Sequence, residues 1–183
     1  MRDIKPANIW LEGKKLRVKV LDFGLAWVSD ALTENENNTT GPVTPEGAIV
    51  GTPAFMSPEY ARSDTVDSRT DLWSLGILLY HMTTGELPFQ GRNAMATLDR
   101  VGVENPLPPI EKNPTVPPSL SDLTMRLLSK AASRPSTAEA VAEELRAIEV
   151  SLVNGVWPGR VNDTVSGVAA SGIVPNSSWF HHS

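Results

Sequence analysis

The stretch TDLWSLGILLYHMTTG, residues 70–85, restricts the fold more than any other part of this 183-residue chain. In a helix, apolar side chains would cover nearly every face of it: Leu72, Trp73, Leu75, Ile77, Leu78, Leu79 and Tyr80. A helix that is apolar on most faces is buried, so other segments have to surround it. Gly85 is expected to end this helix, and His81 within it to be packed or hydrogen-bonded.

Residues 9–21 predict a short β-hairpin. Leu16, Val18 and Val20 alternate with Arg17 and Lys19 after a Glu-Gly-Lys turn at residues 12–14, which is the two-residue period of a strand. Residues 29–47 are rich in Asn, Thr, Glu, Gly and Pro without periodicity, so they predict a long mobile loop.

Two further helices are predicted after a proline-rich connection. The first runs from about Ser119 to Ser129, with its apolar side formed by Leu120, Leu123, Leu127 and Leu128. The second begins at a capping box of Ser136 with Glu139. Its buried stripe is expected to consist of Ala138, Val141, Leu145 and Ile148. The fold class is therefore mainly α with a short β-hairpin, in one domain over residues 1–150, with a loosely ordered tail at 151–183.

Composition excludes several classes of function. The formal charge is -5, from 16 basic and 21 acidic residues without a dense basic block, which argues against nucleic acid as a partner. The absence of cysteine excludes disulfides, thiolate metal sites and a cysteine nucleophile. The sequence has neither an apolar run of membrane-spanning length nor a signal-like apolar stretch near Met1, so we expect no membrane partner and a cytoplasmic protein.

Five motifs occur in one order along the chain: RDIKPAN at 2–8, LDFG at 21–24, GTPAFMSPE at 51–59, DLWSLG at 71–76 and SRPS at 133–136. Their order and spacing resemble the protein kinase family over residues 1 to about 150, and Lys5 resembles the serine/threonine branch. The resemblance implies the larger, C-terminal lobe of a kinase. It also implies ATP-dependent phosphorylation of Ser or Thr hydroxyls on a protein substrate, with Mg²⁺ as the metal ion.

Four residues match the catalytic positions of that family. Phosphoryl transfer needs a base for the acceptor hydroxyl, hard oxygen ligands for magnesium and a cation beside the transferred group. By resemblance Asp3 is the base, Lys5 lies beside the γ-phosphate, and Asn8 and Asp22 bind Mg²⁺ together with the nucleotide phosphates. The hairpin would bring Asn8 and Asp22 to one metal. An ordinary turn after a strand is the alternative interpretation of residues 22–24.

Further matches lie in the segment that precedes the apolar helix. Thr52 resembles the residue that contacts Asp3 and Lys5 beside the acceptor hydroxyl, with an exposed loop threonine as the alternative. Thr44 lies where related kinases are phosphorylated, and Glu46 lies where they have a second such threonine. In the family the arginine at the Arg2 position often pairs with the phosphate, so Glu46 is a candidate partner for Arg2, and a solvated loop carboxylate is the alternative.

Three matched positions have structural roles in the family. Glu59 and Arg134 resemble its buried ion pair, and Asp71 resembles the helix residue that fixes the backbone around Arg2. The segment between Lys130 and Arg134 is one residue shorter than usual, and the polar insertion TENENNTTGP lengthens the activation segment.

The motif at the chain start leads to two competing expectations. Met1 stands where the family usually has histidine, and the sequence has no match to the glycine-rich loop, strand lysine and helix glutamate of the N-terminal lobe. We therefore expect an inactive kinase fragment whose Met1 is an internal residue, with a truncated, non-catalytic binding module that docks proteins near Phe89 and after Gly51 as the alternative. Self-association is expected through an apolar interface formed by Met1, Ile4, Ile9, Leu11 and Phe23.

Overall fold

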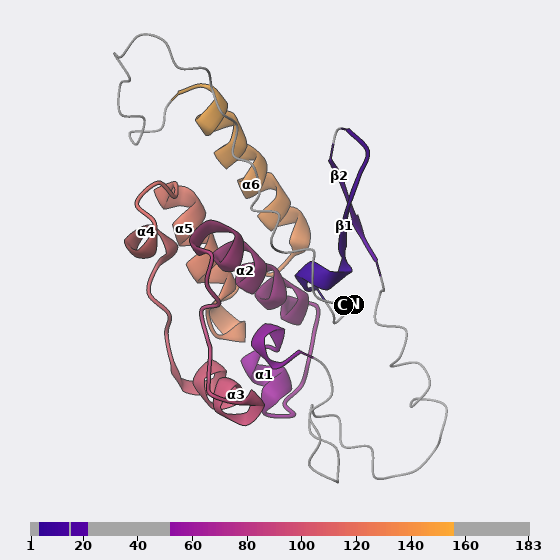
Figure 1. The fold of residues 1–183 in the computed structure, drawn as a ribbon, viewed down its shortest axis with the longest axis vertical. Helices are drawn as coiled ribbons and strands as arrows, with labels where there is room; N and C mark the ends of the chain where they lie inside the picture. Colours follow the sequence, from indigo (N-terminus) through magenta and orange to yellow (C-terminus); the bar gives the residue numbers. More distant parts are fainter. Residues whose placement is uncertain (1–3, 15, 22–51, 156–183) are drawn as a thin grey trace.

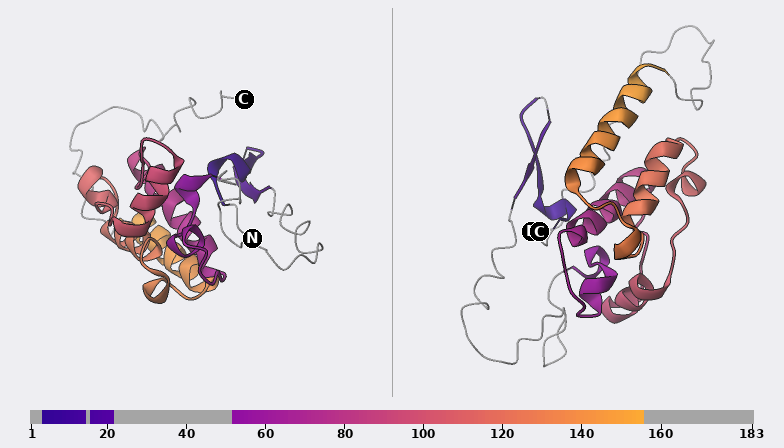
Figure 2. Two further views of the ribbon diagram at one scale, coloured as in Figure 1. Left: turned by 90° about the horizontal axis from the view of Figure 1, so that it is seen from below. Right: turned by 180° about the vertical axis from the view of Figure 1, so that it is seen from behind.

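The computed structural model describes residues 4–14, 16–21 and 52–155, which form a two-stranded antiparallel sheet and a group of helices (Figure 1). This agrees with the predicted class, mainly α with a short β-hairpin. The hairpin stands to one side of the helices in all views (Figure 2). Of the described residues, no helix is both long and apolar enough to cross a membrane.

The hairpin is confirmed, with a correction at its second strand. Strand β1 (Ile9–Glu12) pairs with β2 (Arg17–Val20), and Ile9 lies opposite Val20. Leu16 was expected in the strand, but it lies in the turn with a φ of 48° and donates its N–H to the Gly13 carbonyl at 3.1 Å. The left-handed backbone at Leu16 reverses the chain, so the alternation begins one residue later.

Helix α2 (Arg69–Thr84) is the predicted buried helix, and it lies among the other helices in Figure 1. Trp73, Ile77 and Tyr80 are at most 2% exposed and form one cluster with Phe89. Gly85 ends the helix as predicted, with a φ of 75° and its N–H donated to the His81 carbonyl. A left-handed residue at this position is usually glycine because a side chain would be strained there.

Helix α5 (Pro118–Leu127) is also confirmed, and it packs closely on α2. The contact is made at Gly76, where an added Cβ would lie 2.8 Å from the Cβ of Leu127. A second buried cluster joins these helices to the last one through Leu72, Leu123, Leu127, Val141 and Ile148. Gly76 thus allows two helices to approach at a distance that any side chain would prevent.

Helix α6 (Ala138–Val153) corrects the predicted capping box. The N-cap is Thr137, not Ser136, because Thr137 has the extended backbone of a cap and its Oγ1 accepts the Ala140 N–H at 3.2 Å. Ala138 was expected in the buried stripe, but it is exposed at the first turn, whereas Val141 and Ile148 are buried. The helix extends to Val153, past the predicted domain boundary at residue 150.

Three helices were not predicted: α1 (Pro58–Ala61), α3 (Ala94–Val103) and α4 (Pro109–Lys112). Each has a recognisable start. Asn93 caps α3 by accepting the Ala96 N–H at 2.8 Å, and Ser57 caps α1 by accepting the Tyr60 N–H at 3.3 Å. Proline occupies the first turn of both α1 and α4, where its missing N–H costs nothing.

Candidate active site

The last three residues of the RDIKPAN motif form a short 3₁₀ helix, η1 (Pro6–Asn8), which is followed by β1. The Asn8 N–H donates to the Lys5 carbonyl at 3.0 Å, and the Leu21 N–H donates to the Asn8 carbonyl at 2.7 Å. The end of β2 is therefore held against Asn8, one pair beyond the Ile9–Val20 pair. Two segments separated by the whole hairpin meet at this point.

Asn8 and Lys5 are the described members of the predicted catalytic set. Asn8 is 8% exposed and Lys5 is half-buried. An amide oxygen is a hard ligand that suits Mg²⁺, so the chemistry of Asn8 fits the predicted metal role. Arg2, Asp3 and Asp22 lie outside the described residues, and the predicted roles of all five residues stay predictions.

Thr52 lies at the start of a second 3₁₀ helix, η4 (Pro53–Phe55). Its side chain is exposed and its carbonyl accepts the Phe55 N–H at 3.0 Å. Ser74 of α2 donates its hydroxyl to the Phe55 carbonyl at 2.9 Å, which ties this loop to the buried helix. Thr44 and Glu46 lie outside the described residues.

Glu59 and Arg134 form an ion pair in the interior. Arg134 Nη1 lies 2.7 Å from Glu59 Oε1, and Nη2 lies 3.2 Å from Oε2. The Arg134 side chain is 0% exposed and that of Glu59 is 11% exposed. Arg134 also donates to the carbonyls of Arg69, at 2.7 Å, and Ser129, at 3.0 Å. The short connection before Arg134 therefore still lets the guanidinium reach Glu59.

The environment of Glu59 favours its charged form. Burial by itself raises the pKa of this carboxyl group, but the hydrogen bonds and charge of Arg134 act in the opposite direction, and the net pKa is below the ordinary value. Thr70 adds a hydrogen bond from its hydroxyl to Oε1 at 3.1 Å. The Arg134 guanidinium lies 5.1 Å from the centre of the Trp73 ring, within cation–π range. This network fixes α1, and with it the loop that carries Thr52, onto α2.

Two further positions named from the sequence, Asp71 and Phe89, lie in the described part of the chain. Asp71 lies in the first turn of α2 and is half-buried, but its predicted neighbour Arg2 is outside the described residues. Phe89 is 1% exposed and stacks on Trp73 with ring centres 5.6 Å apart. The docking alternative therefore cannot use the Phe89 side chain itself.

The expected apolar interface is only partly described. Leu11 is exposed, whereas Ile4 and Ile9 are half-buried. Met1 and Phe23 lie outside the described residues, so self-association through this interface stays a prediction.

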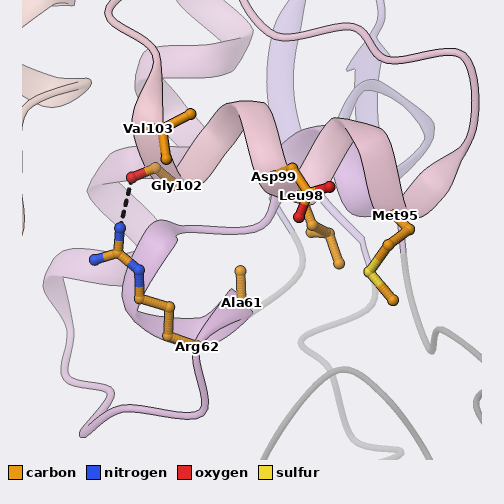
Figure 3. Close-up of a pocket in the computed structure, with 7 residues that line it drawn as sticks. All are labelled: Ala61, Arg62, Met95, Leu98, Asp99, Gly102 and Val103. Atoms are coloured by element: carbon orange, nitrogen blue, oxygen red, sulfur yellow. Dashed lines mark hydrogen bonds between the residues drawn. The ribbon is translucent and has the colours of Figure 1, made fainter.

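A pocket that was not predicted from the sequence lies between α1 and α3 (Figure 3). It is lined by Ala61, Arg62, Met95, Leu98, Asp99, Gly102 and Val103. Helix α3 was not predicted, so its residues were not expected to lie beside Ala61 and Arg62. The available signals were the cap at Asn93 and the helical spacing of Leu98 and Val101, both of which are buried.

Comparison with known proteins identifies the family. The family model described as protein kinase domain matches residues 1–145. The serine/threonine-protein kinase pkn3 of Myxococcus xanthus is 40% identical, covering 81% of this chain and 27% of that protein. The serine/threonine-protein kinases PknB of Mycolicibacterium smegmatis and Mycobacterium tuberculosis are 39% and 37% identical, each covering 86% of this chain and 23% of the relative. The chain spans about a quarter of the length of these relatives. It belongs to the protein kinase family, in the serine/threonine branch.

Proposed function

We propose that the protein containing this chain transfers the γ-phosphoryl group of ATP to serine or threonine hydroxyls of protein substrates. A bond forms between the acceptor oxygen and the γ-phosphorus, the bond from that phosphorus to the β,γ-bridging oxygen breaks, and ADP leaves. The acceptor proton passes to the Asp3 carboxylate, and Lys5 neutralises charge on the transferred group. Bound Mg²⁺ would neutralise phosphate charge, held by Asn8 and Asp22.

One observation carries this proposal most directly: the hydrogen bond from the Leu21 N–H to the Asn8 carbonyl at 2.7 Å. It joins the Asn-containing motif to the residue that precedes Asp22 in the sequence. Two oxygen ligands that are distant along the chain need such a pairing in order to share one cation. Family membership supports the same reaction class.

The test is phosphate transfer from radiolabelled ATP by the full gene product. Asp3→Asn should reduce turnover about 10²- to 10⁴-fold, because a general base contributes that much. Asp22→Asn should remove magnesium-dependent nucleotide binding, measured by calorimetry with and without Mg²⁺. Asp122→Asn, at an exposed position of α5, is the matched control.

Two results would contradict the proposal. Near wild-type turnover by Asp3→Asn would remove the assigned base. Absence of both transfer and nucleotide binding in the unmodified protein would favour the non-catalytic binding module instead.

A further inference from the structure

Ser74 is a polar residue buried in the apolar helix α2. It is 4% exposed, and its neighbours in the sequence are Trp73 and Leu75. Alanine at this position would have a higher helix propensity and no polar atom to satisfy, so packing alone does not account for a hydroxyl group here. A hydrogen-bond partner is needed to account for it.

The carbonyl of Phe55 is that partner. Ser74 Oγ lies 2.9 Å from the Phe55 oxygen and 3.4 Å from the carbonyl oxygen of Thr70, one turn earlier in α2. A helical serine often donates to the carbonyl four residues before it, and such a bond stays within its own helix. A hydroxyl has one proton to donate, and the shorter distance assigns this proton to Phe55.

Phe55 connects Ser74 to Thr52 through two hydrogen bonds. Its carbonyl accepts from Ser74, and its own N–H donates to the Thr52 carbonyl at 3.0 Å. The chain continues from η4 into an extended conformation at Met56, so the Phe55 carbonyl lies at a helix end, where carbonyl groups have no partner within the helix. The Ser74 side chain supplies a donor at this end.

Helix η4 depends on contacts with other elements because it is short. It has three residues, and no side chain caps its start. Beside the bond to Thr52, its backbone is held by the Met56 N–H, which donates to the Pro53 carbonyl at 3.2 Å. A single helical turn is unfavourable by itself. The position of η4 is therefore set by α2 and α3, which pack against it, and the bond from Ser74 is part of the contact with α2.

We propose that Ser74 is a positioning residue for the protein substrate. Its hydroxyl holds the Phe55 carbonyl, this bond fixes η4, and η4 holds Thr52 at the place expected beside the acceptor hydroxyl. Asn8, which is assigned to the metal ion, lies on a different segment, so Ser74 should act on the acceptor and leave the nucleotide unaffected. The proposal rests on the proposed function, since a place beside the acceptor hydroxyl matters only in phosphate transfer.

Hydrogen exchange in the full gene product tests the hold on η4 without catalysis. Ser74→Ala removes one oxygen atom, and the amides of Phe55 and Met56 should then exchange about tenfold faster, the factor for one net hydrogen bond. Mass spectrometry of a peptide that spans residues 52–57 measures this rate. Ser121→Ala is the matched control: Ser121 is 1% exposed, and its Oγ accepts the Ile110 N–H at 3.3 Å, which joins α5 to α4. This control should leave exchange at residues 52–57 unchanged.

Steady-state kinetics separates a positioning role from a general loss of stability. Transfer from radiolabelled ATP to myelin basic protein is measured at a temperature at which thermal unfolding shows both variants to be folded. Ser74→Ala should lower kcat/KM for the acceptor protein about five- to tenfold, because a small displacement of a positioned group slows the reaction. Its KM for ATP, and its magnesium-dependent ATP binding by calorimetry, should stay within about twofold of the unmodified values. Ser121→Ala should change neither quantity.

The outcomes separate this proposal from the proposed function. Equal exchange at residues 52–57 in Ser74→Ala and in the unmodified protein would overturn the positioning role. Strong transfer that Ser74→Ala does not slow, or slows only as much as it weakens ATP binding, would overturn that role and leave the proposed function intact. Faster exchange in a protein that transfers no phosphate would overturn the proposed function and with it the role of Ser74 toward the substrate.

Discussion

The hairpin and the α2 region differ in how deeply their side chains are buried. By the α2 region we mean helix α2 with the residues Glu59, Phe89 and Arg134 that contact it. Around α2, aromatic and aliphatic side chains are almost completely buried, and the Glu59–Arg134 pair is in the interior. In the hairpin, Trp10, Leu11 and Val18 are each more than 40% exposed, and a two-stranded sheet alone is only marginally stable. The motifs proposed for catalysis, at 2–8 and 21–24, flank the hairpin, whereas the α2 region forms the buried core. The residues proposed for catalysis therefore lie next to the part of the described chain whose apolar side chains are the more exposed.

The largest expected effect concerns the buried ion pair. Arg134→Met should lower the free energy of unfolding by about 3 to 5 kcal/mol, because Glu59 would remain buried without its partner. Urea unfolding measures the loss. The double variant Glu59→Gln, Arg134→Met should recover part of it, and a double variant no more stable than Arg134→Met would show that packing, not charge, accounts for the effect.

The contact of α2 with α5 gives the next largest effect. Gly76→Ala should cost about 1 to 2 kcal/mol, since the new Cβ would overlap Leu127 and Leu128 and the better helix propensity of alanine offsets only part of the strain. Gly102→Ala is the matched control, because its Cβ meets open space apart from Arg62. A stable Gly76→Ala protein would mean that α5 shifts easily on α2.

These two regions also show what the sequence could predict. The α2 helix has a long run that is apolar on most faces and the hairpin has a two-residue alternation, and both predictions are confirmed. Helix α3 was missed because one of its three buried positions is the polar Thr97 and because Gly102 near its end has a low helix propensity. Ser136 and Thr137 are both good caps, so the sequence alone could not choose between neighbours. The Glu59–Arg134 pair followed from the family resemblance, since no local pattern joins residues so distant in sequence.

Acid should weaken the α2 region through Glu59. Its pKa in the folded protein is below the ordinary value of 4.5, so this carboxylate contributes stability that is complete above that value. The contribution is lost as the pH falls through the lowered pKa. The free energy of unfolding should therefore decrease as the pH falls below 4.5, and Glu59→Gln should reduce the slope. Glu143→Gln, on the exposed side of α6, is the control for removing one carboxylate. An unchanged slope in Glu59→Gln would exclude this role.

The corrected cap of α6 predicts a smaller effect. Thr137→Ala should lower the free energy of unfolding by about 1 kcal/mol, because the Ala140 N–H loses its acceptor. Ser136→Ala should change it much less. Thermal unfolding of both variants distinguishes the two caps, and the reverse order would restore the capping box at Ser136.

The smallest effect is expected in the hairpin. Lys19 Nζ lies 2.5 Å from Glu12 Oε1, and both side chains are about half exposed. Glu12→Gln should change stability by about 0 to 1 kcal/mol, because water screens such a pair. A larger loss, measured by hydrogen exchange at Arg17 and Lys19, would show that the hairpin depends on its surface charges.

The pairing of Asn8 with Leu21 has a consequence for how such a sequence can vary. The two strands fix which residues lie opposite each other, and a shift of one residue would turn every side chain of a strand to the other face. The turn between the strands does not share this restriction, since it only has to connect the end of β1 to the start of β2. We therefore expect homologous chains to accept changes in the length and composition of the turn, while the number of residues from Asn8 to Glu12 and from Arg17 to Leu21 stays constant.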